Sequence, residues 1–423
     1  MSILFDNARI LQPDGTVQPG VVAVEGALIR YAGPKSGLEQ RMRKTVDCKN
    51  GILMPGLANA HTHLGMTVFR GFCNHLPLEE WLHQVWALED QLTEEDVYWA
   101  SLLSIMEMTA SGATCFLDMY FHMEAVARAV ADSGMRGVLS RGLQSLGAPG
   151  NRVQEAKELH SNWHGAGGRI TTMVGPHSVY TCDEAMLRQS VALSEELGVG
   201  LHIHLCESRQ EVADCQQAHS CSPVALCEQF GLFDRPVVVG HGVELTEADM
   251  DILAKYNVTV AHCPGSNLKL GNGIAPVTAL QQRGINVALG TDSAASNNNL
   301  DVWEEMQTAS LLQKLALRDA GALSAQQTLA MATRNGYAGL QIDNAGALAA
   351  GKAADMVLVR TDRPVFQPGL DAAADLVFAA NRADIAMTMV AGRILYDHGQ
   401  WPTIEVEDVL RNIQRTAARL FRE

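Results

Sequence analysis

Short apolar runs alternate with amphipathic segments through the middle of the chain. Eight such runs occur, at residues 57–61, 113–118, 135–141, 170–176, 199–205, 236–240, 257–262 and 285–290. Helical spacing of apolar positions is present between several of them, at 94–111, 121–133, 184–197 and 246–255. Strands that alternate with helices predict a parallel sheet, and eight repeats predict closure into a (β/α)8 barrel, the TIM barrel. A doubly wound open sheet is the alternative, but it usually has a glycine-rich phosphate turn after its first strand, where this chain has histidines.

The two ends of the chain have a different pattern. Short runs typical of strands occur near the N-terminus, at 8–11, 21–24 and 28–31, and again near the C-terminus, at 355–359, 386–390 and 392–395. Neither end has enough strands to enclose a core alone, so we expect the two sets to pack together. We therefore predict a small β-sandwich domain, formed by residues 1–55 and 346–423, with the barrel of residues 56–345 inserted between its halves.

Composition excludes several classes of function. The chain has 423 residues, 47% of them apolar, and a formal charge of 32 − 47 = −15, which is typical of a globular protein and unsuited to nucleic-acid binding. No apolar run approaches the roughly 20 residues that cross a bilayer, and the first residues lack a secretory pattern, so we expect a cytoplasmic protein with no membrane contact. The nine cysteines contain no Cys-x-x-Cys pair, which favours reduced, packed thiols. The sequence is compatible with a homo-oligomer but does not indicate one.

Chemistry is concentrated at the C-terminal ends of four predicted strands. These ends carry His61 and His63, then His202 and His204 with Glu207 three residues on, then His241, and finally Asp292. In barrel enzymes the reactive groups lie at this end, and residues i and i+2 of a strand point to the same side. Nitrogen and oxygen ligands with an open position suit catalytic Zn²⁺, with Fe²⁺ or Mn²⁺ as alternatives. We predict a divalent metal site there.

Longer motifs extend this picture to a family. Met54-Pro55-Gly56-Leu57 precedes the first His-x-His pair, and the segments 175–178, 266–273 and 290–298 surround the other predicted strand ends. Together they resemble the amidohydrolase superfamily over nearly the whole chain. With Glu89, Arg141 and His177 added, the chain is similar to the 5′-methylthioadenosine/S-adenosylhomocysteine deaminases. The resemblance implies hydrolytic deamination of the adenine ring of S-adenosylhomocysteine, 5′-methylthioadenosine and related adenosines, which yields the inosine analogues and ammonia.

The resemblance also assigns roles to residues. It gives one divalent metal ion per subunit, most simply Zn²⁺, to His61, His63, His204 and Asp292. It gives the catalytic proton transfers to Glu207, His241 and Asp292. It implies that the nucleoside substrate is bound by Glu89 at the ribose hydroxyls and by Arg141 and Arg152 at the tail carboxylate. His177, Glu207 and Asp292 would lie near the base. A second ion is not expected, because such sites use a bridging lysine and no lysine lies between Lys157 and Lys255.

Three assignments compete with plainer interpretations. Arg141 could pair with a protein acid such as Asp118, and Glu89 could be a solvated acid on a helix. Arg152 follows Pro149-Gly150-Asn151 in a predicted loop, where alignment is less certain. His202 fits no ligand role and is interpreted as a neighbour that supports the ligands.

Other functions also stay open. The same scaffold supports guanine and other base deaminases and triazine hydrolases, which have less use for Glu89 and an arginine pair. A metal-free scaffold protein would be expected to have lost part of the ligand set, which is complete here. A nucleoside-binding protein without turnover would release no ammonia.

Overall fold

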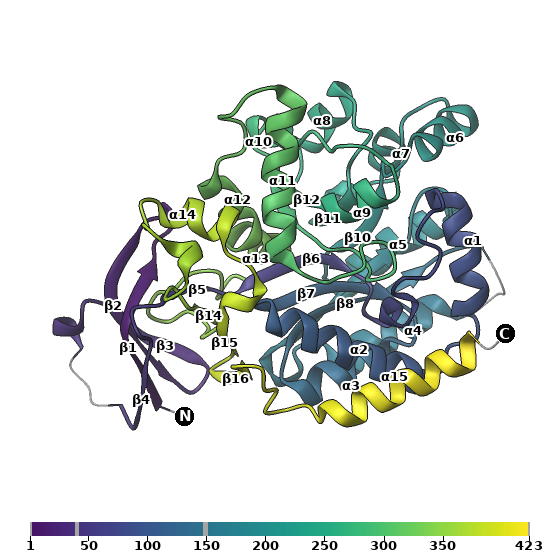
Figure 1. The fold of residues 1–423 in the computed structure, drawn as a ribbon. Coiled ribbons are helices and arrows are strands. Elements are labelled where there is room, and N and C mark those ends of the chain that lie inside the picture. The colour runs from purple at the N-terminus through teal and green to yellow at the C-terminus, as the bar shows by residue number, and fades with distance from the viewer. Residues whose placement is uncertain (1, 39–41, 147–150, 422–423) are drawn as a thin grey trace.

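Eight parallel strands form the centre of the computed structural model, which describes residues 2–38, 42–146 and 151–421 (Figure 1). They are β6 (Leu57–Thr62), β7 (Ala113–Tyr120), β8 (Arg136–Leu143), β9 (Ile170–Pro176), β10 (Leu201–Leu205), β11 (Val237–His241), β12 (Val258–His262) and β13 (Asn286–Leu289). They pair in sequence order. The first and last meet where Asp292 N donates to His61 O at 2.9 Å, and Thr291 N to Asn59 Oδ1 at 3.0 Å. The predicted (β/α)8 barrel is confirmed, and the open doubly wound sheet was not the right alternative.

Helices cover the outside of the barrel. Those between the strands are α1 (Leu78–Glu89), α2 (Glu94–Ala110), α3 (Met123–Ser133), α4 (Arg152–Trp163), α5 (Glu184–Leu197), α6 (Arg209–His219), α7 (Pro223–Gln229), α8 (Glu247–Leu253), α9 (Pro264–Lys269) and α10 (Val277–Gln282). After β13 follow α11 (Val302–Leu317), α12 (Ala325–Ala332) and α13 (Arg334–Gly339). Side chains of Thr93, Asp183 and Thr246 accept a backbone N–H in the first turn of α2, α5 and α8, which explains where these predicted helices begin.

Strands from both ends of the chain share one sheet beside the barrel. They are β1 (Ser2–Leu11), β2 (Val17–Glu25), β3 (Leu28–Gly33), β4 (Lys44–Asp47), β5 (Ile52–Pro55), β14 (Met356–Val359), β15 (Ile385–Val390) and β16 (Arg393–Asp397). The order is β16-β15-β14-β5-β1-β2-β3, with β4 paired to β1. The antiparallel pair of β5 and β14 joins the N-terminal strands to the C-terminal ones. The expectation that the two ends pack together is therefore met.

The last helix belongs to the surface of the barrel rather than to this sheet. Helix α15 (Val406–Leu420) runs along α2 (Figure 1). Thr416 Oγ1 donates to Asp96 Oδ1 at 2.6 Å, and Arg419 forms an ion pair with the same carboxylate. The boundaries 1–55, 56–345 and 346–423 stay a prediction. Besides α15, other parts of the last range contact the barrel, since Asp355 pairs with Arg136 and Thr388 Oγ1 donates to Thr109 O.

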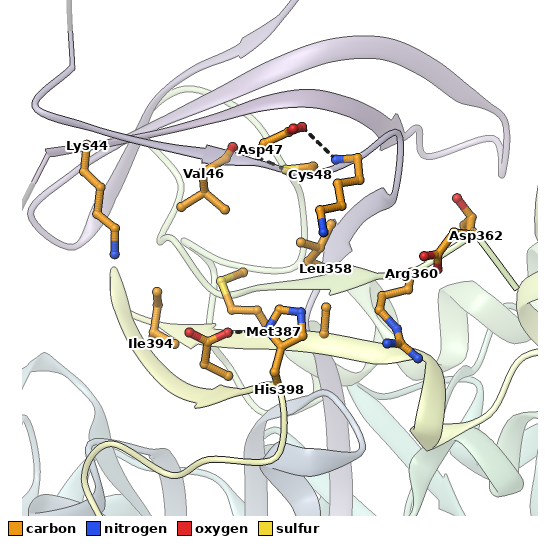
Figure 2. A pocket seen from close by; sticks show the side chains of 14 residues that line it. Lys44, Val46, Asp47, Cys48, Leu358, Arg360, Asp362, Met387, Ile394 and His398 are labelled. Carbon is orange, nitrogen blue, oxygen red and sulfur yellow. Dashed lines mark hydrogen bonds and ion pairs between the residues drawn. The ribbon is translucent and has the colours of Figure 1, made fainter.

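A cavity of about 260 Å³ lies within the small domain. Figure 2 shows it between the strand that carries Lys44 and Val46 and the strands that carry Leu358, Met387 and Ile394. It shares no lining residue with the larger pocket at the barrel mouth. Among the described residues, none of the helices combines the length and the apolar character that a membrane crossing requires.

Candidate active site

A pocket of about 940 Å³ opens at the C-terminal ends of the barrel strands. Every site residue predicted from the sequence lines it except His61, which is fully buried behind it. The wall also includes apolar side chains such as Met66, Trp81 and Leu270. A concave pocket of this size, mostly apolar with a few converging polar groups, is typical of a site for a small molecule such as a nucleoside.

Five side chains converge at the bottom of this pocket. Ligand atoms of His61, His63 and Asp292 lie within 4.8 Å of one another, as do those of His61, His204 and His241. His63 Nε2 lies 3.2 Å from both Asp292 Oδ1 and His204 Nε2. His61 Nε2 lies 3.7 Å from Asp292 Oδ1. The structure thus brings the four predicted ligands together and adds His241 to the same group.

The four histidines are each held from behind through Nδ1. The contacts are His61 with His202 Nε2 at 2.7 Å, His63 with Met119 O at 2.5 Å, His204 with His177 O at 2.8 Å, and His241 with Asn267 Oδ1 at 2.9 Å. A partner at one ring nitrogen leaves the other free to ligate a metal. His61 Nε2 is buried and has no hydrogen-bond partner among the described residues. This donor set, with one buried nitrogen left unsatisfied, fits a divalent metal ion.

His202 contacts one of the predicted ligands, the position expected of a supporting neighbour. It faces His61 through Nε2, while its Nδ1 lies 3.1 Å from Ser140 Oγ. Met119 and Asn267 act in the same way, but the sequence analysis missed them. A main-chain carbonyl leaves no trace in the side-chain pattern. Asn267 had a signal, because it lies in the conspicuous segment 266–273.

Asp292 is oriented by two serines. Its Oδ2 accepts from Ser266 Oγ at 2.6 Å and from Ser296 Oγ at 2.7 Å, which leaves Oδ1 directed at His61 and His63. Burial alone would raise the pKa of Asp292, but the hydrogen bond and charge of His63 outweigh it and lower the pKa. The carboxylate is therefore ionised at neutral pH, as a metal ligand must be.

Glu207 lies beside this group and is also buried. Its Oε2 lies 3.6 Å from His241 Nε2, and its Oε1 accepts from Asn272 Nδ2 at 3.1 Å. Burial raises the pKa of Glu207, so its carboxyl group keeps a proton to higher pH than usual, which suits a general acid. The turn expected at Gly271–Gly273 is present, with φ of +72° and +128° at the two glycines. No pattern in the sequence indicates that Asn272 reaches Glu207 from that turn.

Glu89 is the last residue of α1 and lines the pocket. It is 9% exposed, so the alternative of a solvated helix acid is wrong. Tyr120 Oη donates to its Oε1 at 2.6 Å. Burial raises the pKa of Glu89 to about 7, although the Tyr120 hydrogen bond opposes this shift. One carboxylate oxygen stays available for hydroxyl donors in the pocket.

Arg141 and Glu155 form an ion pair in the outer part of the pocket. Arg141 Nε donates to Glu155 Oε2 at 2.6 Å, and its Nη1 donates to Gly142 O. The proposed competitor, Asp118, instead accepts from Leu64 N at 2.8 Å. Arg141 therefore has a protein partner, but an exposed one from α4, and it still lines the pocket.

Arg152 and His177 complete the wall. Arg152 is the first residue of α4, not a loop residue, and its Nη1 donates to Gln144 O at 2.6 Å. Pro149 and Gly150, which were expected to precede it in that loop, lie outside the described residues. His177 Nδ1 lies 3.0 Å from Thr181 Oγ1. Burial, with a smaller contribution from His63, lowers the pKa of His177 to about 3, so its ring is neutral at pH 7.

Comparisons with known proteins identify relatives of this chain. A model of the amidohydrolase family matches residues 52–395. The 5-methylthioadenosine/S-adenosylhomocysteine deaminase of Desulforudis audaxviator (strain MP104C) is 46% identical over 100% of this chain and 99% of its own. An adenosine deaminase from Xanthomonas campestris, solved with bound zinc, is 33% identical, with a TM-score of 0.94 over 99% of this chain and 98% of its own.

A triazine hydrolase shares the fold at lower identity. The zinc complex of atrazine chlorohydrolase from Arthrobacter aurescens TC1 is 23% identical, with a TM-score of 0.90 over 98% of this chain and 100% of its own. Likeness at that level concerns the fold alone. The family match and the full-length identity with the deaminase go further. On these grounds, the chain belongs to the amidohydrolase family.

Proposed function

We propose that this protein deaminates the adenine ring of S-adenosylhomocysteine, 5′-methylthioadenosine and related adenosines by hydrolysis. The observation that carries the proposal is the buried acid Glu207 beside the histidine and aspartate donor set, in a pocket that also contains Glu89 and two arginines. The base, the ribose hydroxyls and the tail carboxylate of such a nucleoside would each have a partner among these groups. The full-length identity with a relative of that name supports the substrate class.

His61, His63, His204 and Asp292 would hold the ion, which when bound supplies a Lewis acid that activates water at neutral pH. We propose Zn²⁺, because the similar adenosine deaminase was solved with zinc. Metal analysis of the purified protein distinguishes it from Fe²⁺ and Mn²⁺.

The side chains of this chain carry the proton transfers. Glu207 donates a proton to N1 of the purine, which makes C6 open to attack by water. His241 Nε2 and the Asp292 carboxylate lie on the side from which water attacks, and they accept its proton. Asp292 then returns this proton to the departing ammonia. The second proton of the attacking water, released when the C6 carbonyl forms, restores the proton that Glu207 gave to N1.

The rest of the pocket orients the substrate. Glu89 accepts from the ribose hydroxyls, since its carboxylate is buried and faces the pocket beside Tyr120. Arg141 and Arg152 bind the carboxylate of an amino-acid tail. His177, neutral and close to His204, forms the wall beside the base.

A substrate panel tests this function. Adenosine, S-adenosylhomocysteine, 5′-methylthioadenosine, guanine and a chlorotriazine are compared by absorbance change and ammonia release, with metal content measured on the same sample. We expect ammonia from the adenine compounds and no chloride from the triazine. Release from guanine alone would favour the base-deaminase alternative, and binding without ammonia would favour a nucleoside-binding protein.

Substrate binding should strengthen as pH rises through about 7, because Glu89 accepts hydroxyl donors best when ionised and its pKa lies near 7. Below that pH the protonated group offers a weaker acceptor. Glu89→Gln should raise KM about tenfold at pH 8 and abolish this pH dependence. KM measured from pH 6 to 8.5 checks the expectation, with 2′,3′-dideoxyadenosine as the control substrate that should not respond.

Arg141→Met should raise KM for S-adenosylhomocysteine by about tenfold or more, because a charged hydrogen bond to the tail carboxylate is lost. For 5′-methylthioadenosine, which has no carboxylate, KM should stay within about twofold. Initial rates on both substrates measure this, with Arg209→Met as a control, since Arg209 is exposed and pairs with Glu244 away from the pocket wall. Equal losses on the two substrates contradict the assignment.

A further inference from the structure

The chain turns sharply just before the proposed proton donor. Strand β10 ends at Leu205, and Cys206 adopts a φ of +53°, in the left-handed region. The backbone N–H groups of Cys206 and Glu207 then point to one side. Successive N–H groups in such a turn form a concavity that binds an anion.

The side chain of Glu211 occupies that concavity. Its Oε1 accepts from Cys206 N at 3.0 Å, and its Oε2 accepts from Glu207 N at 2.7 Å. Glu211 is 4% exposed and is not part of the pocket wall, so it does not contact the substrate. The contact it makes is with the backbone of the proposed acid itself.

This contact differs from ordinary helix capping. Ser208 caps α6, and its Oγ accepts from Glu211 N at 3.1 Å. In a capping box the acid at the third helical position would reach back to the N–H of the capping residue. Glu211 reaches beyond Ser208, to the two preceding residues. A helix can begin without such a contact. The contact of Glu211 with the two N–H groups therefore has another effect, which is to immobilise the segment that carries Glu207.

The other side of the same segment is held by the loop after β11. Cys206 O accepts from Val243 N and Glu244 N, both at 2.9 Å, which are two and three residues after His241. The peptide unit before Glu207 is therefore held on both sides. At the side chain, Glu207 has Asn272 at 3.1 Å and His241 at 3.6 Å. A rotation of this backbone would carry the carboxyl group away from both.

We propose that Glu211 is a positioning residue, which fixes the backbone of Glu207 so that the Glu207 carboxyl group meets the purine in the geometry for proton transfer. The inference rests on the proposed function. It predicts an effect on turnover rather than on substrate binding, because misplacement of a reacting group by a fraction of its own size can cost as much as a hundredfold in rate.

Glu211→Gln tests the inference with a side chain of the same shape. The amide replaces one acceptor with a donor that faces a backbone N–H. We expect kcat to fall about 10- to 100-fold, with KM within about twofold and metal content unchanged. Asp214→Asn is the matched control, because Asp214 is an exposed acid on α6 bonded to Gln210, and it should leave all three values unchanged. Glu211→Asp, one methylene shorter, is the second variant if the amide lowers the yield of folded protein.

Two readouts separate positioning from a general loss of stability. If Glu211 acts through Glu207, the double variant with Glu207→Gln should be no more than about twofold slower than Glu207→Gln alone. Amide hydrogen exchange at residues 206 and 207 should be faster in Glu211→Gln than in Asp214→Asn. Multiplicative rate losses, or unchanged exchange, overturn the inference. A wild-type protein that releases no ammonia from any adenine compound overturns the proposed function instead, and exchange still decides whether Glu211 holds the segment.

Discussion

Replacing Glu207 with glutamine should reduce turnover of S-adenosylhomocysteine by a factor of about 10² to 10⁴, with metal content and substrate binding retained. The amide has the same shape and can keep its contact with Asn272, but it has no acidic proton to give to N1. Burial raises the pKa of the native group, so that proton is present at higher pH than in an ordinary glutamate. Single-turnover rates and binding by calorimetry measure the two effects separately.

A substrate analogue without N1 provides one control for this variant. 1-Deazaadenosine has a C–H group in place of N1, so it should bind to both proteins and be deaminated by neither. Glu195→Gln, on the outer helix α5 and away from the pocket wall, should behave as the wild type. Turnover near the wild-type rate in Glu207→Gln would mean that another group donates the proton.

The central part of the fold follows from the sequence because two simple periodicities govern it. Buried parallel strands appear as short apolar runs, and the eight expected runs coincide with β6 to β13 to within a few residues. The same regularity places His61, His204 and Asp292 at the C-terminal ends of three barrel strands, so this group of candidate ligands could be predicted without knowledge of any loop. Helices such as α8, which lies within the predicted segment 246–255, follow from the helical spacing of apolar positions.

What the sequence could not show depends on contacts between distant segments. Helix α15 is amphipathic, but nothing in its pattern says that Thr416 meets Asp96 on the barrel rather than the small domain. The contacts that hold the site residues in place also join distant segments. Asn272 reaches Glu207 across 65 residues, and Glu155 meets Arg141 only because α4 folds back over β8.

Removal of the metal should abolish ammonia release, to below about a thousandth of the initial rate, and added Zn²⁺ should restore it. The ion-free pocket leaves His61 Nε2 without a partner and brings Asp292 and several histidines close together, so the melting temperature should also fall. Dialysis against a chelator, followed by rate and thermal-unfolding measurements, checks both outcomes. His63→Asn should mimic the chelator, whereas His160→Asn, outside the pocket beside Thr172, should retain the ion.

The pH dependence of Zn²⁺ binding identifies which side chain loses a proton when the ion binds. Burial alone would lower the pKa of His63, but the hydrogen bond and charge of Asp292 outweigh it and raise the pKa to about 9 in the ion-free protein. At neutral pH the empty site therefore holds a proton on His63, which must leave when the ion binds. Apparent Zn²⁺ affinity should rise about tenfold or more per pH unit up to about pH 9, with at least about one proton released per ion. Calorimetry in buffers of different ionisation enthalpy counts that proton, and zero release would contradict a site built on His63 and Asp292.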